Sequence, residues 1–203
     1  MARRRKPLFE GPDWTFELMG KTYREIEKIA EKELKLDLYP NQIEIISSEQ
    51  MLDAYSSIGM PLMYRHWSFG KSFLGQERSY RKGHMGLAYE IIINSNPCIS
   101  YNMEENTMAM QTLVMAHAAF GHNHFFKNNH LFRQWTDADG ILDYLDYARR
   151  FVAECEEAHG EAEVERVLDA AHALMPQGVF RYERPARPTL REERDRHRER
   201  LDQ

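Results

Sequence analysis

The pattern of apolar and polar positions predicts a chain made mostly of helices. Over residues 13–36, apolar side chains recur three or four positions apart, as on one face of a helix, and Asp13 is the expected N-cap. The other predicted helices are residues 48–57, a short helix before Gly83, and residues 106–120, 136–159 and 161–175. Gly121 is expected to end the helix over 106–120, because glycine commonly follows a helix C-terminus.

The helix over 136–159 is expected to begin at Thr136 or Asp137 and to end at His159. A stripe of apolar side chains along it should face the core. The stripe consists of Ile141, Tyr144, Leu145, Ala148, Phe151, Val152 and Cys155.

Two segments in the middle of the chain predict a β-hairpin. Residues 87–94 alternate in the manner of a strand, with Tyr89 on one face and Glu90 on the other, and residues 98–102 can pair back after a turn. An isoleucine-rich run at 42–46 predicts one more short strand. The expected fold class is therefore α+β, mainly α: a helical domain with a small antiparallel β-hairpin or sheet and an extended charged C-terminal helix or tail.

Composition and charge narrow the class of protein. Hydrophobic residues make up 42% of the 203 positions, enough for one sizeable core. The formal net charge of -5 argues against a nucleic-acid partner, since proteins that bind nucleic acids carry a basic surface. No apolar run approaches the roughly 20 residues that cross a bilayer, and no secretory signal is recognisable, so we expect a cytoplasmic protein without membrane insertion.

The two ends of the chain differ from its middle. Residues 1–12 read as a basic flexible arm, and 13–180 as the globular domain. Residues 181–203 hold eight arginines among six acidic residues and almost no large apolar side chains. Such a segment has no face to bury, which predicts a charged helix or tail that packs little against the domain.

Histidines between positions 117 and 130 are the first candidates for chemistry. His117, His122 and His124 are possible ligands of a divalent metal such as zinc, iron or manganese, because neutral imidazole is a common metal ligand. The five-residue step from His117 to His122 differs from the four-residue step that places two imidazoles on one α-helical face. Position 118 is alanine, so the glutamate of a His-Glu-x-x-His protease is also absent. Buried histidines that are merely hydrogen-bonded would explain the cluster as well.

A second constellation lies in the last turn of the helix over 136–159. Glu156 and His159 are three residues apart, the Glu-x-x-His spacing of di-iron carboxylate proteins, but the chain holds one copy where such proteins use two. A histidine beside a helix C-terminus is an equally good explanation. Candidates for a catalytic acid, base or further ligand are Glu90, Glu105 and His66.

Four unusual strings are similar to one known family. They are YRHWSFGK at 64–71, GLAYEIIINSNP at 86–97, MEENT at 103–107 and GHNHFFKNN at 121–129. Together, over about residues 14–185, they resemble the stage V sporulation protein R (SpoVR) family.

The resemblance implies a cytoplasmic bacterial protein that is linked, in spore formers, to the making of the spore cortex. Relatives also occur in bacteria that do not sporulate, and the family supplies no catalytic residues to carry over. Family members continue past the charged segment at 191–203, so the resemblance implies an N-terminal portion or a truncated member.

Two functions remain open at this point. One is a metal-dependent hydrolase or oxidoreductase, with imidazoles that hold the ion and a carboxylate that acts as base or bridging ligand. The other is a non-catalytic assembly or regulatory protein that binds a protein partner through its surface of histidine, asparagine and aromatic side chains.

Overall fold

The structure, a computed structural model, describes residues 7–57, 64–177, 191 and 198. The chain divides into two units, Met1–His159 and Gly160–Gln203, and each is described by itself. The first unit contains, in chain order, α1 (Phe16–Lys28), the π-helix η1 (Ile29–Glu33), β1 (Asn41–Ile46), α2 (Ser48–Ser56), α3 (Trp67–Arg81), β2 (Glu90–Ile93), β3 (Cys98–Met103), α4 (Met108–Val114), the π-helix η2 (Met115–His122), α5 (Asn123–Asn128), α6 (His130–Trp135) and α7 (Ile141–His159). The second unit contains α8 (Glu161–Leu174) and a 3₁₀ turn, η3 (Met175–Gln177). The predicted fold class, α+β and mainly α, is confirmed.

The predicted division of the chain into residues 1–12, 13–180 and 181–203 stays a prediction. Residues 1–6 and, apart from 191 and 198, all residues from 178 onward lie outside the described part. The expected properties of the arm and the tail fall on those residues.

The three strands form one mixed sheet in the order β1-β3-β2. The predicted hairpin is present, since β2 pairs antiparallel with β3. The expectation of an antiparallel sheet is wrong for β1, which pairs parallel with β3. The chain between β1 and β3 contains α2, α3 and β2, and a connection of this length allows a strand to return in the same direction.

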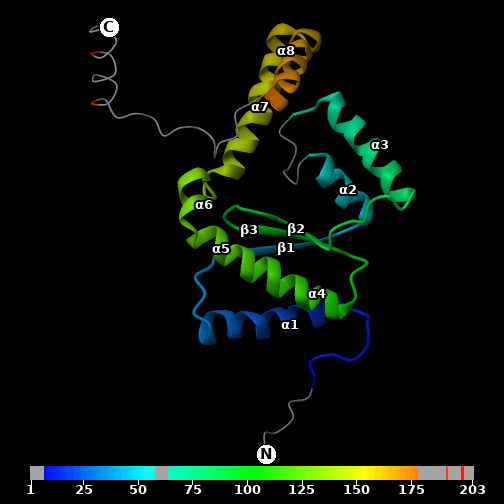
Figure 1. Cartoon of the computed structure of the whole chain (residues 1–203), viewed down its shortest axis with the longest axis vertical. Helices are drawn as coiled ribbons and strands as arrows, with labels where there is room; N and C mark the ends of the chain where they lie inside the picture. The colour runs from blue at the N-terminus through cyan, green and yellow to red at the C-terminus, as the bar shows by residue number, and fades with distance from the viewer. Residues whose placement is uncertain (1–6, 58–63, 178–190, 192–197, 199–203) are drawn as a thin grey trace, which may run out of the picture. The chain divides into compact units, whose positions relative to one another are not determined.

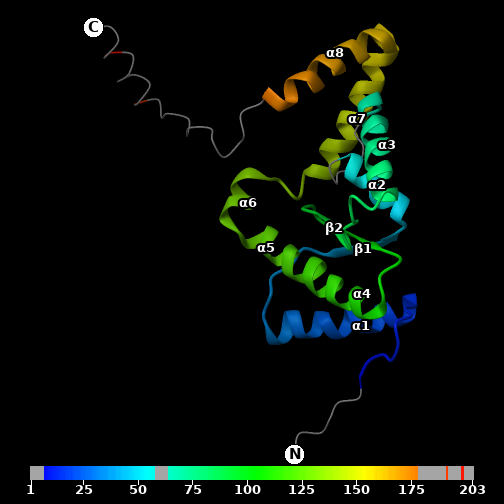
Figure 2. The same ribbon diagram turned by 45° about the vertical axis from the view of Figure 1, so that its right-hand side comes forward.

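One face of the sheet is covered by α1 and by the continuous helix formed by α4, η2 and α5. Figures 1 and 2 show this continuous helix next to the sheet and α1 beyond it. Ile43 and Ile45 of β1 pack against Met19, Met108 and Met115, which are buried. Burial of these apolar side chains is the main source of stability for such a layer and fixes the helices over the strands.

The predicted helix over 13–36 begins later than expected and changes from α-helical to π-helical hydrogen bonding near its end. Thr15, and not Asp13, is the N-cap, because its hydroxyl accepts a hydrogen bond from the backbone N–H of Leu18 at 3.2 Å. The last turn is the π-helix η1. It ends at Glu33, and Lys35, two residues further on, has a φ of +54°.

The prediction that Gly121 ends a helix is wrong. The chain continues without a break from α4 through η2 into α5. Glycine costs about 1 kcal/mol in a helix relative to alanine, but packing overrides this preference. The residues just before Gly121 supply that packing, since Ala118, Ala119 and Phe120 are at most 2% exposed.

The predicted start and core-facing stripe of α7 also need correction. Asp137 caps a turn by accepting the backbone N–H of Gly140, and the helix begins only at Ile141. Of the predicted stripe only Leu145 is buried, whereas Tyr144 and Phe151 are more than half exposed. Helical periodicity identified one face of α7, but within the described part of the chain only Leu145 of that face is buried.

Asn123 ties the end of η2 to the start of β1. Its Oδ1 accepts the backbone N–H of Tyr39 at 2.8 Å, and its Nδ2 donates to the carbonyl of Tyr39 at 2.9 Å and to Oδ1 of Asn41 at 2.7 Å. The side chain is fully buried. These three bonds, which we call the Asn123 clamp, fix η2 relative to the sheet.

We predict that Asn123→Ala destabilises the fold by about 2–4 kcal/mol, because it leaves the N–H and C=O groups of Tyr39 without partners. Urea unfolding measures the loss. Asn128→Ala is the matched control, since the Asn128 amide is exposed and donates to the Asp37 carbonyl at 2.9 Å. The control should cost less than about 1 kcal/mol. Equal losses for the two variants would contradict the structural role of the clamp.

Candidate functional site

The π-helix η2 brings His117 and His122 side by side. In an α-helix of 3.6 residues per turn, residues five apart point about 140° away from each other. In a π-helix each N–H bonds to the carbonyl five residues back, so residues five apart lie on the same side of the helix. The two imidazole ring centroids are 4.5 Å apart, with the rings edge to face. The five-residue spacing therefore places both histidines on one face of this helix.

Glu90 reaches the same place from the sheet. It opens strand β2, and its Oε1 lies 3.9 Å from Nε2 of His117. The Glu90 side chain is 20% exposed, whereas that of His117 is 64% exposed. A separation of 3.9 Å is too long for a hydrogen bond, so the two groups face each other across a gap. We call Glu90, His117 and His122 the Glu90 cluster.

His122 is the more enclosed histidine of the cluster. Its ring stacks on Phe126 at a centroid distance of 5.7 Å, and Phe126 in turn contacts Phe132. Burial lowers the pKa of His122 below 6.5, the positive charge of a protonated His117 lowers it further, and Glu90 acts in the opposite direction. His122 is therefore held in its neutral form at neutral pH, ready to donate a ring lone pair.

His124 lies elsewhere on α5. Its Nδ1 accepts the backbone N–H of Asp37 at 3.1 Å, and Lys127 of the same helix forms an ion pair with the Asp37 carboxylate at 2.6 Å. His124 thus holds the loop before β1, next to the Asn123 clamp.

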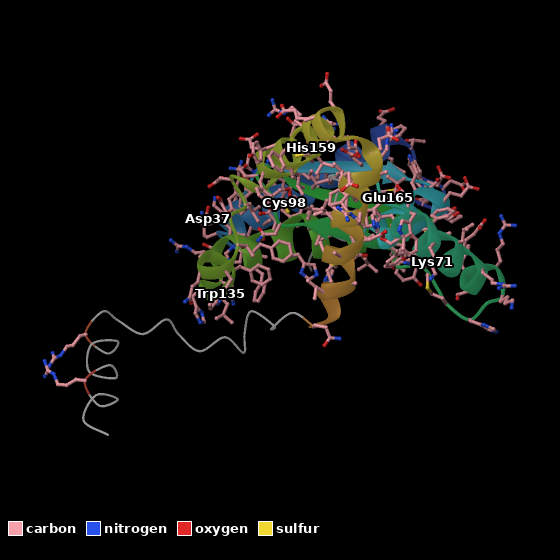
Figure 3. The ribbon with its side chains drawn as sticks, turned by 90° about the horizontal axis from the view of Figure 1, so that it is seen from above. Asp37, Lys71, Cys98, Trp135, His159 and Glu165 are labelled. Carbon is pink, nitrogen blue, oxygen red and sulfur yellow. The ribbon has the colours of Figure 1, made fainter. Side chains whose placement is uncertain are left out.

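Glu156 and His159 end α7. His159 is exposed. In Figure 3, His159 lies well apart from Asp37, the residue that His124 binds. The structure does not bring Glu156 or His159 into the Glu90 cluster.

The other candidate residues have local roles. His66 caps α3, because its Nδ1 accepts the backbone N–H of Ser68 and lies 2.6 Å from the Ser68 hydroxyl. Glu105 is exposed in the turn between β3 and α4. Cys98, the first residue of β3 (Figure 3), is buried, and burial raises the pKa of its thiol to about 11, which keeps the thiol protonated and unreactive.

Asn102 is a neighbour of Glu90 that the sequence analysis did not single out. It is fully buried and pairs directly with Glu90 across β2 and β3. The available signal was an asparagine at an inward-facing position of a predicted strand, where apolar residues are usual.

The ability of the cluster to hold a metal can be judged from its geometry. Among the described residues, no three or more His, Cys, Asp or Glu side chains are already arranged so that they could hold an ion. The Glu90 cluster nevertheless supplies two imidazoles and one carboxylate, the donor set that suits zinc, iron(II) and manganese(II). The ring of His122 would have to turn about its side-chain torsions to complete such a site.

Comparison with known proteins identifies the family. The family model described as SpoVR like protein matches residues 13–203, and the chain belongs to this family. It is 61% identical over 193 residues to the uncharacterized protein YcgB of Escherichia coli (strain K12). That match covers 95% of this chain but 38% of the relative, so the chain spans well under half of the relative's length. No solved structure matches the chain. Within the described residues, no helix has both the length and the apolar character needed to cross a membrane.

We predict that NMR titration of the metal-free protein gives His122 a midpoint below 6.5. Glu90→Gln should lower the midpoint further, because it removes the carboxylate that favours the protonated ring. His117→Asn should raise it, because it removes a neighbouring cation. The unfolded chain takes up this proton at a higher pH than the folded chain does, so the unfolded state gains stability relative to the folded state as the pH falls below 6.5. A midpoint that rises in Glu90→Gln would contradict the arrangement of the cluster.

Proposed function

We propose that this chain is a metal-dependent enzyme component in which Glu90, His117 and His122 bind one divalent transition-metal ion. The observation that carries the proposal is the π-helical register of η2, which sets two histidines of a five-residue spacing together and opposite a carboxylate. Short π-helical turns are uncommon and frequently occur at functional sites, where they redirect side chains.

The distance between His117 and Glu90 fits two ligands of one metal ion better than it fits a direct hydrogen bond. With metal–ligand bonds of about 2.0–2.2 Å, two ligand atoms of a tetrahedral ion lie roughly 3.3–3.6 Å apart. The 3.9 Å gap between His117 and Glu90 is close to this separation and needs only a small side-chain movement. The lowered pKa of His122 helps as well, because an imidazole must be neutral to bind a metal.

The surroundings suit a reaction centre. Three protein ligands leave positions open, and there a bound ion would activate water for hydrolysis or would bind an oxidant for redox chemistry. The exposed edge of His117 leaves the cluster accessible to a substrate, and Phe126 forms an apolar wall behind His122. A hydrolase or an oxidoreductase is therefore the proposed class.

A second candidate function, binding of a protein partner, is favoured by α7. Tyr144, Tyr147 and Phe151 lie along one side of this helix and are 51–60% exposed, and the rings of Tyr147 and Phe151 stack at 6.0 Å. Exposed aromatic side chains are enriched in protein interfaces. The double variant Tyr147→Ser/Phe151→Ser should lose binding of the protein partner without a change in metal content.

The cytoplasmic location and the link to spore-cortex formation belong to the same proposal. Both rest on membership of the SpoVR-like family, and neither depends on the geometry of the Glu90 cluster.

We predict about one metal ion per chain after reconstitution of purified protein with zinc, iron(II) or manganese(II), measured by elemental analysis. His117→Ala, His122→Ala and Glu90→Gln should each lose most of the metal, because two ligands hold an ion poorly. His124→Ala and His159→Ala are the matched controls and should keep it, since both histidines lie outside the cluster.

Two results would overturn the proposal. One is a metal content far below one ion per chain for all three metals. The other is a loss of metal in the control variants that equals the loss in the cluster variants.

A further inference from the structure

Asn102 stands beside the Glu90 carboxylate on the buried face of the sheet. The two residues are direct partners in the antiparallel pairing of β2 and β3, so their side chains point to the same face. Such partners have Cβ atoms about 4.5–5.5 Å apart. On the other edge of β3, Ile45 of β1 is the direct partner of Asn102. Ile45 packs against the buried methionines Met19, Met108 and Met115, which identifies this face of the sheet as the inner one.

The Asn102 amide is held in one orientation and has an unused donor. Ser100 donates its hydroxyl hydrogen to Asn102 Oδ1 at 2.9 Å, and both residues are at most 1% exposed. Asn102 Nδ2 is buried and has no hydrogen-bond partner. A buried N–H group without a partner costs about 1–3 kcal/mol and is rare in native proteins.

Two other buried side-chain amides, those of Asn106 and Gln111, bond to backbone carbonyls near the same end of the hairpin. They differ from Asn102 in which polar atom lacks a hydrogen-bond partner. Asn106 donates to the carbonyl of Tyr89, and Gln111 donates to the carbonyl of Met103. Their side-chain oxygens have no partner. Asn102 is therefore the one amide of the three whose NH₂ group has no partner, so both of its N–H donors are open to an acceptor such as the Glu90 carboxylate.

We propose that Asn102 is a positioning residue for Glu90. When an ion occupies the Glu90 cluster, one oxygen of the Glu90 carboxylate faces the ion, and the other accepts a hydrogen bond from Asn102 Nδ2. Groups that hydrogen-bond to metal ligands fix their orientation, and loss of such a group typically weakens metal binding 10–100-fold. The inference rests on the proposed metal site, and it gives the unpaired NH₂ group of Asn102 a partner.

Zinc is the probe for the test, because it is diamagnetic and allows NMR on the loaded protein. Asn102→Leu removes the donor at nearly constant volume and should weaken zinc binding about 10-fold or more, measured by competition with a chelator. Asn94→Leu is the matched control. Asn94 follows the end of β2, about 13 Å along the strand from Glu90, and its amide donates to Thr136. This variant should bind zinc as the wild type does.

A second measurement keeps the inference testable if Asn102→Leu fails to fold. In the wild type, the side-chain NH₂ signals of Asn102 should move downfield when zinc is added, because a hydrogen bond forms. Unmoved signals, or unchanged zinc affinity in a folded Asn102→Leu variant, would overturn the role of Asn102 while leaving the metal site intact. Absence of binding by the wild type for zinc, iron(II) and manganese(II) alike would instead refute the metal site itself, and Asn102 with it.

Discussion

The hydrogen-bond register of η2 is the constraint on which the candidate site depends. A π-helix is intrinsically less favourable than an α-helix and persists only where its surroundings hold it. Here Ala118, Ala119 and Phe120 are almost completely buried against the core, and the Asn123 clamp fixes the far end. Packing on one side of the helix thus sets the direction of His117 and His122 on the other.

The histidine- and asparagine-rich string at 121–129 divides between two tasks. Asn123, His124 and Lys127 bind the loop before β1 and serve the fold. His122 stacks on Phe126 and belongs to the Glu90 cluster. Metal-binding residue types therefore do not act together merely because they are close in sequence. In this chain Glu90, a strand residue 32 positions before His122, faces His117 in the cluster, whereas His124, two positions after His122, binds Asp37 instead.

Local patterns predicted those parts of the structure that local interactions decide. The hairpin followed from alternation in residues 87–94 and from the turn after it, and both strands are present. Parallel pairing of β1 depends on contacts across more than fifty residues and leaves no local mark. The stop at Gly121 failed because propensity was weighed without the burial of the residues before it.

The candidate site was predictable in its residues but not in its grouping. Glu90, His117 and His122 were all recognised, yet the spacing of five argued against a shared face because an α-helix was assumed. Periodicity of 3.6 residues cannot reveal a change to i→i+5 hydrogen bonding. Asn102 was missed because an inward-facing asparagine acquires meaning only when its cross-strand neighbour is known.

The contact between the two imidazole rings tests this account most directly. Histidine-selective labelling and a nuclear Overhauser experiment on the metal-free protein report whether ring protons of His117 and His122 are close. The account predicts a strong cross-peak, since the ring centroids are 4.5 Å apart. In a regular α-helix the rings would point to different sides and give none. Absence of the cross-peak in a folded protein, with both rings assigned, would contradict the π-helical register and remove the basis of the site.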